Sequence, residues 1–317
     1  MSRFVVTGCA GFIGSHLVEA LLSRGDDVVG IDSFTGYSER ETKEANLKAV
    51  ASDAGFSLSE ADLVTCELDE MIAGSGGVFH LAAQPGVRQS WGEPFENYVR
   101  NNVLASQRVF EAASRLDRRV VWASSSSVYG NSTSFPTSED ALLQPISPYG
   151  VTKVACEYLA RAYVESGGLE AVGLRYFTVY GPRQRPDMAF QQIIAALRGG
   201  TPFSLYGSGG QTRDVTYVGD AVAATLAAMQ VGRCSAVYNV GGGNETSLRE
   251  AIALIEELSG RRLVVDRKPA VRGDAGRTAA DTSRARAELG WAPATTLRAG
   301  LAAQLDSMDG GLSVTPP

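Results

Sequence analysis

The fold of this chain is decided by the stretch Thr7-Gly8-Cys9-Ala10-Gly11-Phe12-Ile13-Gly14. It follows a short apolar run, Arg3 to Thr7, and precedes a segment, His16 to Arg24, in which apolar residues recur with helical spacing. Glycines at such a junction allow a tight turn and a close approach of the backbone to a pyrophosphate, and the helix N-terminus offers unpaired N–H groups. The stretch therefore predicts a dinucleotide-binding loop between the first strand and the first helix.

The alternation of strand and helix patterns continues to about Gly181. Short apolar runs predict strands at 28–31, 77–81, 120–123 and 171–174. Longer segments with helical periodicity predict helices at 97–115 and 148–166. This alternation is typical of an α/β fold with a Rossmann-type, doubly wound parallel sheet. Beyond Gly181, glycine and proline residues predict loops around a helix at 189–198, as expected for a smaller C-terminal α/β substrate domain.

This change of pattern gives the expected domain boundaries. Residues 1–180 would form the nucleotide-binding domain, and about 213–240 would return to it. Residues 181–212 and 241–309 would form the substrate domain, and 310–317 would be a loose tail.

The composition restricts the partners and the location of the protein. A formal net charge of −6 argues against nucleic acid or an anionic membrane as the main partner. No apolar stretch reaches the roughly 18 residues of a membrane span. The four scattered cysteines form no C-x-x-C pair, which indicates reduced thiols in a cytoplasmic protein. His16 and His80 lack the spacing of metal ligands, so we expect no metal site.

Acidic residues follow the second and third predicted strands. A carboxylate at Asp32 would accept hydrogen bonds from the adenosine ribose and repel a 2′-phosphate, which predicts NAD rather than NADP. The plain alternative for Asp32 is a solvated aspartate in a turn. Asp62 and Leu63 are candidates for contact with the adenine, and a surface loop is the alternative for both.

Tyr149 and Lys153 are four residues apart, so they project from the same side of a helix. A phenol has an ordinary pKa of about 10, and an ammonium group nearby stabilises the phenolate and lowers that pKa. The pair therefore predicts a general base. Because Tyr-x-x-x-Lys is also common as a surface pair, the interpretation depends on the glycine loop upstream and on the serine cluster at 124–127.

These motifs, with several later ones, resemble the extended short-chain dehydrogenases/reductases of the nucleotide-sugar epimerase and dehydratase kind. The resemblance covers nearly the whole chain. Its marks are Thr7 to Gly14, His80-Leu81-Ala82-Ala83-Gln84, Asn102, Ser125 to Gly130, Tyr149 to Lys153, Arg175-Tyr176-Phe177, Gly207-Ser208-Gly209, Arg213 to Val218, Tyr238-Asn239-Val240 and Arg272-Gly273-Asp274. The resemblance implies tightly held NAD, a UDP- or dTDP-linked sugar, and a homodimer that packs helices 97–115 and 149–166.

The resemblance also implies roles for individual residues. Tyr149 would remove a proton from a sugar hydroxyl, Lys153 would hydrogen-bond the nicotinamide ribose, and Ser125 would hydrogen-bond the reacting hydroxyl. The expected cofactor contacts are Gly8, Gly11, Phe12, Ile13, Gly14, Asp32, Asp62, Leu63, Leu81, Ala82, Ala83, Gln84, Asn102, Tyr149, Lys153 and Tyr176.

Ser126 and Ser127 indicate the type of reaction. Sugar 4,6-dehydratases of this family carry an Asp-Glu pair at these positions, and UDP-glucuronate decarboxylases typically carry a glutamate just before Val-Tyr-Gly. Serines titrate far from neutral pH, so the site lacks the second acid and base that elimination needs. Such a site suits oxidation and re-reduction at one carbon, which is epimerisation. The alternative is that these serines only cap the end of a strand.

Thr178 and the run Arg185-Pro186-Asp187-Met188-Ala189 indicate the substrate. With Gln84 to Arg88, they are similar to the UDP-glucuronate 4-epimerases, whereas epimerases of neutral UDP-hexoses usually carry asparagine in place of Thr178. Hydroxyl and guanidinium groups would hold the uronate carboxylate, unless Arg88 and Arg185 are ordinary surface arginines. The expected substrate contacts are Arg88, Ser125, Ser126, Ser127, Tyr149, Thr178, Arg185, Tyr206, Arg213, Arg272 and Asp274.

Within this set, Arg213 and Arg272 match phosphate-binding arginines, Asp274 matches a ligand of the uridine ribose, and Tyr206 is either a wall of the uracil pocket or a core residue.

The sequence therefore predicts an NAD-dependent isomerase, a 4-epimerase that interconverts UDP-glucuronate and UDP-galacturonate through a 4-keto intermediate. The alternatives are a UDP-glucose or UDP-N-acetylglucosamine 4-epimerase, a UDP-glucuronate decarboxylase, and an inactive cofactor-sensing regulator. Ser125, Tyr149 and Lys153 argue against the last.

Overall fold

A parallel sheet of seven strands forms the larger part of the molecule. The computed structural model describes residues 2–35, 39–269 and 275–309. The strand order is β10-β6-β5-β4-β1-β2-β3, and every neighbouring pair is parallel. The bounds are β1 Arg3–Thr7, β2 Asp27–Asp32, β3 Phe56–Glu60, β4 Val78–His80, β5 Val120–Ser125, β6 Ala171–Tyr176 and β10 Val237–Val240. The order reverses between β1 and β4. At such a switch point, α/β sheets bind ligands at the carboxyl ends of the strands.

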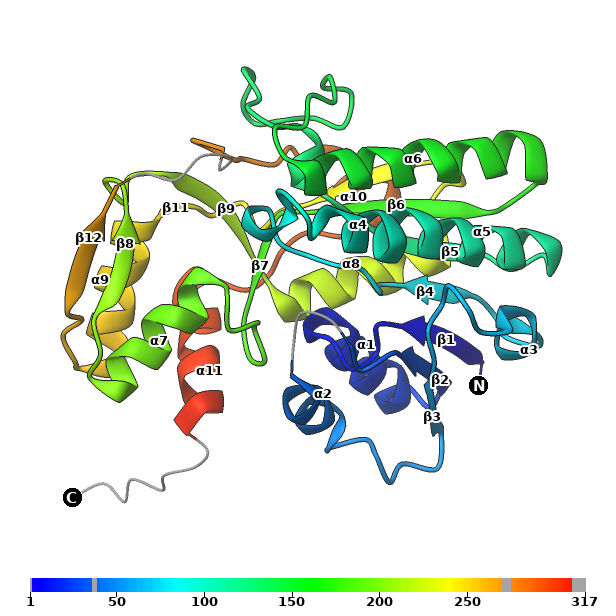
Figure 1. The fold of residues 1–317 in the computed structure, drawn as a ribbon, viewed down its shortest axis with the longest axis horizontal. Coiled ribbons are helices and arrows are strands. Elements are labelled where there is room, and N and C mark those ends of the chain that lie inside the picture. The colour runs from blue at the N-terminus through cyan, green and yellow to red at the C-terminus, as the bar shows by residue number, and fades with distance from the viewer. Residues whose placement is uncertain (1, 36–38, 270–274, 310–317) are drawn as a thin grey trace.

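Helices cover both faces of this sheet, as Figure 1 shows. One core contains apolar side chains of α1 (Phe12–Ser23), α8 (Val218–Val231) and α10 (Ser283–Leu289). The core on the other face contains those of α3 (Leu68–Ile72), α5 (Ala105–Arg115) and α6 (Pro148–Gly167). Strands buried on both faces are continuous apolar runs, which is why these runs could be recognised in the sequence. The predicted doubly wound parallel sheet is confirmed.

The helix predicted at 97–115 is interrupted by a π-helical segment. The structure has α4 (Phe95–Tyr98), then π-helical turns over Val99–Leu104, then α5. Such wide turns are often found at functional sites. Here the segment carries Asn101 and Asn102 toward the end of β4.

The smaller part of the molecule contains two small sheets. In the first, β9 (Thr212–Tyr217) pairs in parallel with β7 (Thr178–Tyr180) and antiparallel with β11 (Glu245–Ser247). In the second, β8 (Phe203–Tyr206) pairs with β12 (Val265–Lys268). The helices α7 (Ala189–Gly199), α9 (Leu248–Ser259) and α11 (Leu297–Asp309) pack around a third core. α2 (Arg40–Leu47) lies beside α1 in the larger part.

The segment 213–240 is divided between the two parts. β10 is an edge strand of the large sheet and α8 packs on that sheet, whereas β9 belongs to the small sheet with β7 and β11. The residues 213–217 thus pair with strands outside the large sheet. Over the described ranges, no helix combines the length and the apolar character needed to cross a bilayer.

Candidate active site

A cavity of about 740 Å³ lies between the carboxyl ends of the large sheet and the smaller part of the molecule. All predicted site residues within the described ranges line it except Asn102. The smaller part contributes residues of the 181–192 segment, β8 and β9. Arg272 and Asp274, predicted as substrate contacts, lie outside the described residues.

The glycine loop leaves no room for side chains where a dinucleotide would approach. Gly8 has a φ of 70°, and a Cβ there would lie 2.7 Å from the backbone nitrogen of Ala82. A Cβ at Gly14 would overlap the carbonyl oxygen of Gly8. The glycines therefore let the loop pack closely on itself and on Ala82 while it lines the cavity at the N-terminus of α1, which suits a pyrophosphate. The residues that are present fit an NAD-type cofactor.

Asp32 closes β2 and is almost fully buried at the edge of the cavity. Its carboxylate accepts hydrogen bonds from the backbone N–H groups of Ala10, at 3.2 Å, and Phe34, at 2.9 Å. The ammonium of Lys43 donates to Oδ1 at 2.8 Å and also lines the cavity. The sequence interpretation missed Lys43, whose position eleven residues after Asp32 has no recognisable spacing.

Asp62 and Leu63 lie at the same end of the cavity, after β3. The carboxylate of Asp62 accepts a hydrogen bond from Arg100 Nη2 at 2.6 Å and from the backbone N–H of Val64 at 2.9 Å. Leu63 is buried. The predicted adenine contacts are thus placed on the cavity wall, and Arg100 of the π-helical segment orients the carboxylate.

Asn102 does not line the cavity, and the direct cofactor contact predicted for it does not fit its placement. Its fully buried amide accepts from the backbone N–H of Gln84 at 2.7 Å and donates to Gln84 O at 3.1 Å and to Thr152 Oγ1 at 3.0 Å. The Thr152 hydroxyl donates to the carbonyl of Tyr149 at 2.7 Å. Asn102 therefore fixes Gln84 relative to the Tyr149 helix. Its neighbour Asn101, which was not predicted, lines the cavity instead.

His80 holds the end of β4, from which Leu81, Ala82 and Ala83 line the cavity. Its ring lies 2.8 Å from Thr7 Oγ1 and 3.0 Å from Ser106 Oγ. Burial lowers the pKa of His80 to about 3, and the nearby charge of Lys153 acts in the same direction. The ring is therefore neutral and serves as a structural bridge.

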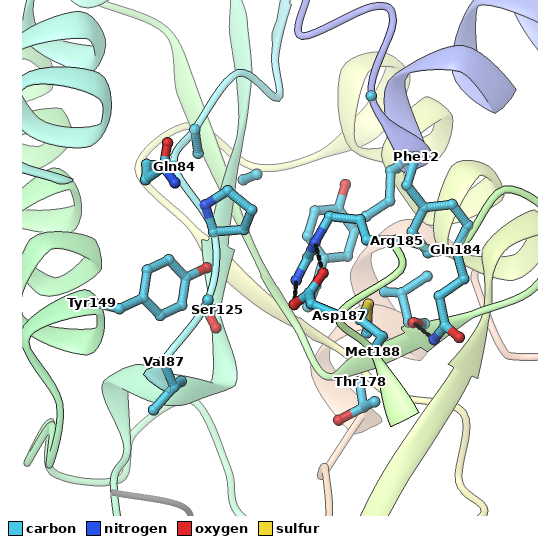
Figure 2. Close-up of a pocket in the computed structure, with 18 of the residues that line it drawn as sticks. Phe12, Gln84, Val87, Ser125, Tyr149, Thr178, Gln184, Arg185, Asp187 and Met188 are labelled. Atoms are coloured by element: carbon cyan, nitrogen blue, oxygen red, sulfur yellow. Dashed lines mark hydrogen bonds and ion pairs between the residues drawn. The ribbon is translucent and has the colours of Figure 1, made fainter. Parts of the chain in front are cut away.

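Tyr149 and Lys153 lie on the first turns of α6, whose start is fixed by local sequence. Ser147 caps the helix by accepting from the N–H of Gly150, and Pro148 occupies the first turn. Lys153 is buried, donates to the carbonyl of Ala123 at 2.9 Å, and lies 6.0 Å from the ring centre of Tyr149. Figure 2 shows Tyr149 and Ser125 on the same wall of the cavity.

The serine cluster both caps a turn and lines the cavity. Ser125 Oγ accepts from the backbone N–H of Ser127 at 3.1 Å and lies 3.1 Å from Ser127 Oγ. It thereby starts a 3₁₀ turn over Ser126–Val128. The capping side chain is that of Ser125, not of Ser126 or Ser127, for which capping was the alternative, and all three serines line the cavity.

The opposite wall is formed by the end of β6 and the segment that follows it. Thr178, at the start of β7, lines the cavity, and so does the ring of Tyr176, whose hydroxyl is 2.6 Å from Thr225 Oγ1 and is not available to a ligand. Arg185 forms a bidentate ion pair with Asp187, with Nε–Oδ1 at 3.0 Å and Nη2–Oδ2 at 3.1 Å (Figure 2). Arg185 is thus oriented within the cavity by a neighbour that was not predicted to take part.

Arg88 and Tyr206 both line the cavity and contact each other. The guanidinium carbon of Arg88 lies 5.2 Å from the ring centre of Tyr206, so the cation stacks on the aromatic face. Arg88 therefore lies beside the predicted uracil wall, and Tyr206 is partly exposed rather than a core residue. Arg213 of β9 lines the same region.

Comparison with known proteins agrees with this arrangement. The family model described as GDP-mannose 4,6 dehydratase matches residues 5–304. A Bacillus subtilis (strain 168) protein named Uncharacterized UDP-glucose epimerase YtcB is 41% identical over 302 residues, which are 94% of this chain and 95% of that protein. The crystal structure of UDP-glucuronic acid 4-epimerase from Bacillus cereus, in complex with UDP-glucuronic acid and NAD, is 40% identical and has a TM-score of 0.94, over 97% of this chain and 99% of that chain.

MoeE5, crystallised with NAD and either UDP-glucose or UDP-glucuronic acid, is 42% identical with a TM-score of 0.89, over 98% of this chain and 100% of that chain. These matches span nearly the whole chain, and the residues matched by the family model, 5–304, contain the glycine loop and the Tyr149/Lys153 pair. The chain therefore belongs to the nucleotide-sugar epimerase family of extended short-chain dehydrogenases/reductases, which the GDP-mannose 4,6 dehydratase model represents.

Proposed function

We propose that this protein is an NAD-dependent 4-epimerase, an isomerase that interconverts UDP-glucuronate and UDP-galacturonate through a transient 4-keto sugar. One observation carries the proposal. Among the described residues, the carboxylates that line the cavity are Asp32, Asp62 and Asp187, and each is ion-paired, with Lys43, Arg100 and Arg185 respectively. Within the described ranges, the serine hydroxyls and the Lys153 ammonium lie on the wall that carries Tyr149, and no unpaired carboxyl group lines the cavity to serve as the second acid of a dehydration or a decarboxylation.

The cofactor would be held by the backbone of the Gly8–Gly14 loop, by Asp32 at its adenosine ribose and by Lys153 at its nicotinamide ribose. When bound, NAD takes up a hydride from the sugar and gives it back, so the reaction has no net redox change. Leu81, Ala82, Ala83 and Gln84 would border it along the end of β4.

Tyr149 would take the proton of the sugar 4-hydroxyl and return it at the end of the reaction. The Lys153 ammonium, held by Ala123, stabilises the phenolate by its charge. Ser125 would hydrogen-bond the same oxygen, because its hydroxyl is fixed by the turn that it caps. Each of these groups is buried or half-buried, which strengthens the electrostatic interactions among them.

The hydroxyls of Ser126, Ser127 and Thr178 would hold the C6 carboxylate of a uronate. Oxidation of glucuronate at C4 creates a β-keto acid, which loses CO₂ when the bond to the carboxylate aligns with the carbonyl π system and charge leaves the carboxylate. Donors that hold the carboxylate oppose both conditions. The arrangement is thus suited to epimerisation without decarboxylation.

The UDP part would bind near Arg213 and Tyr206, with Arg88 stacked on Tyr206. Arg272 and Asp274 are proposed to bind the second phosphate and the uridine ribose on the family resemblance alone. The Bacillus cereus relative, named for UDP-glucuronic acid, supports the uronate, and MoeE5 was crystallised with both sugars. The second candidate is a 4-epimerase of the neutral sugar nucleotide UDP-glucose. It is favoured by the ion pair between Arg185 and Asp187, because the charge of Arg185 is already matched by a carboxylate of the protein.

We further propose a homodimer built on the π-helical segment, α5 and α6. Val99, Leu104, Val151 and Tyr158 on these helices are exposed to between 41% and 62%, which is unusual for large apolar side chains.

We also propose that the protein is located in the cytoplasm, in keeping with four cysteines that form no disulfide. Fractionation of the source cells would contradict this location if the protein were found outside the cytoplasmic fraction.

Incubation of the purified protein with UDP-glucuronate, followed by NMR of the sugar, tests the proposal. The expected product is UDP-galacturonate, with no product from Tyr149→Phe, which lacks only the hydroxyl that carries the proton. UDP-glucose is supplied in a parallel reaction. Turnover of UDP-glucose alone would replace the proposal by the second candidate, and formation of UDP-xylose or a 4-keto-pentose would identify a decarboxylase.

A further inference from the structure

Arg183 lies in the loop that joins β7 to α7, and its backbone is left-handed, with a φ of 64°. Its chain neighbours Gln184 and Arg185 line the cavity, whereas Arg183 does not. A left-handed backbone is uncommon for a residue with a side chain, and it persists only where the surroundings fix it. The contacts of the Arg183 side chain supply such a constraint.

The guanidinium of Arg183 reaches two helices of the larger part of the molecule. Its Nη2 donates to Glu19 Oε2 at 2.6 Å and to His16 Nδ1 at 3.1 Å, both on α1. Its Nη1 donates to the carbonyl of Asn46 on α2 at 3.0 Å. A planar guanidinium can serve these three acceptors at once, which a lysine ammonium on a flexible stem does less well.

His16 adds a second tie to the same loop. A guanidinium has no acceptor, so His16 Nδ1 must accept from Arg183, and Nε2 must carry the ring proton. That proton points at the carbonyl of Pro182, 2.9 Å away. Burial lowers the pKa of His16, and the Arg183 charge lowers it as well, although the bond to Pro182 acts in the opposite direction. The neutral ring is thus fitted between two successive loop residues.

The anchors of Arg183 belong to the elements that form the dinucleotide site. α1 begins directly after the glycine loop. Asn46, which accepts from Arg183 with its carbonyl, donates with its amide to the carbonyl of Ala10 inside that loop at 2.9 Å. The Arg183 side chain therefore connects the loop after β7 to the backbone on which the cofactor would lie.

The same loop is held from the smaller part by Gln304 of α11. Gln304 is fully buried, accepts from the N–H of Gly181 at 3.1 Å and donates to Gln184 Oε1 at 3.0 Å. The loop is therefore clamped between the two parts, with Arg183 as the clamp on the cofactor side.

We propose that Arg183 is a positioning residue for the reaction proposed above: it fixes loop 181–188 on α1 and α2 so that Gln184 and Arg185 are presented to the sugar half of the substrate. The inference rests on the proposed function. A loop that is ordered before binding costs less to order when the substrate arrives. Loss of the clamp should therefore weaken substrate binding more than it slows the chemical step.

The test compares three variants of the NAD-loaded protein. Arg183→Gly removes the side chain and keeps the left-handed backbone free of strain, because glycine adopts it readily. Arg183→Lys keeps the charge facing Glu19 and loses the planar fork. The control is Asp117→Gly, an exposed residue after α5 whose φ is also positive, at 54°. The readouts are hydrogen exchange of loop 181–188, KM and kcat with UDP-glucuronate, and bound NAD.

For Arg183→Gly we expect hydrogen exchange in the loop to accelerate and KM to rise about tenfold, with kcat within about threefold of the parent and NAD content unchanged. Arg183→Lys should show exchange rates and a KM between those of Arg183→Gly and those of the parent. Asp117→Gly should match the parent in both. Unchanged exchange, or faster exchange with an unchanged KM, would overturn the proposal, as would loss of NAD together with a general fall in stability. Failure of the parent to epimerise would refute the proposed function, while the exchange data would still decide whether Arg183 fixes the loop.

Discussion

At the scale of single residues, Thr178 is the side chain on which the fate of the 4-keto sugar is most directly tested. It lies at the start of β7 on the cavity wall, and its hydroxyl is the group that we propose to hold the carboxylate together with Ser126 and Ser127. A hydrogen bond to a charged group contributes about 1.5–3 kcal/mol. Removing it should weaken binding of the uronate and free the carboxylate in the oxidised intermediate.

We therefore expect Thr178→Ala to lower kcat/KM for UDP-glucuronate by about tenfold or more and to release CO₂ with a UDP-pentose product. Thr178→Ser, which keeps the hydroxyl, is the matched control and should retain most of the activity without CO₂. The products are quantified by NMR and by trapping of labelled CO₂. If Thr178→Ala released no more CO₂ than the parent, Thr178 would have no protective role.

The residues that could be predicted from the sequence are those whose chemistry depends on local spacing. Gly8 and Gly14 in one turn, and Tyr149 and Lys153 on one helix face, require only the sequence within a few positions. Lys43 and Arg100 were not predicted, because they reach Asp32 and Asp62 over separations of 11 and 38 residues. Such partners are defined only by the fold.

For Asn102, the sequence motif and the structure point to different roles. The motif indicated a cofactor contact, but the π-helical segment turns the side chain into the core, where it binds the backbone of Gln84. The neighbouring Asn101 faces the cavity. An insertion of this kind into a helix shifts the face of each following residue and leaves no periodic signal in the sequence.

At the scale of helices and strands, the proposed homodimer would be formed by the exposed apolar side chains of α6 and of the π-helical segment that precedes α5. Val151 and Tyr158 are seven residues apart on α6, so they lie on one face, and they are 50% and 62% exposed. Figure 1 shows α5 and α6 side by side on one flank of the larger part. Two copies of this pair would bury these side chains against each other.

We predict that Val151→Glu combined with Tyr158→Glu converts a dimer into a monomer, because four like charges would meet across a two-fold interface. Sedimentation equilibrium gives the mass directly. Leu142→Glu, a change at a loop residue that is 75% exposed, is the control and should remain dimeric. A parent protein that sediments as a monomer would contradict the proposed assembly.

The elements of the large sheet were predictable because strands covered on both faces are continuous apolar runs. The strand β12 was not predicted, since all four of its residues are exposed and no apolar pattern marks it. The pairing of β9 with β7 and β11 was not predicted either, because β9 directly precedes α8, and α8 packs on the large sheet. Local pattern gives the type of an element more reliably than its partners.

At the scale of the whole molecule, the reaction depends on which groups the fold brings into one cavity. The sequence shows acids at many positions, but only the assembled structure shows that the described carboxylates on the cavity wall are each paired with a cation. In the part of the chain that the structure describes, the wall around Tyr149 then carries serine hydroxyls and the buried ammonium of Lys153. We propose that such a site oxidises one carbon of the sugar and restores it with the opposite configuration.

The most direct test of this claim follows the hydrogen at C4. UDP-glucuronate that carries deuterium at C4 is converted by the purified protein in ordinary water, and UDP-galacturonate is isolated and examined by NMR and mass spectrometry. We predict that the product keeps its deuterium at C4, because the hydrogen would be transferred as a hydride to the cofactor and returned from it without exchange with water. A product in which deuterium at C4 has been replaced by hydrogen from the solvent would contradict the account.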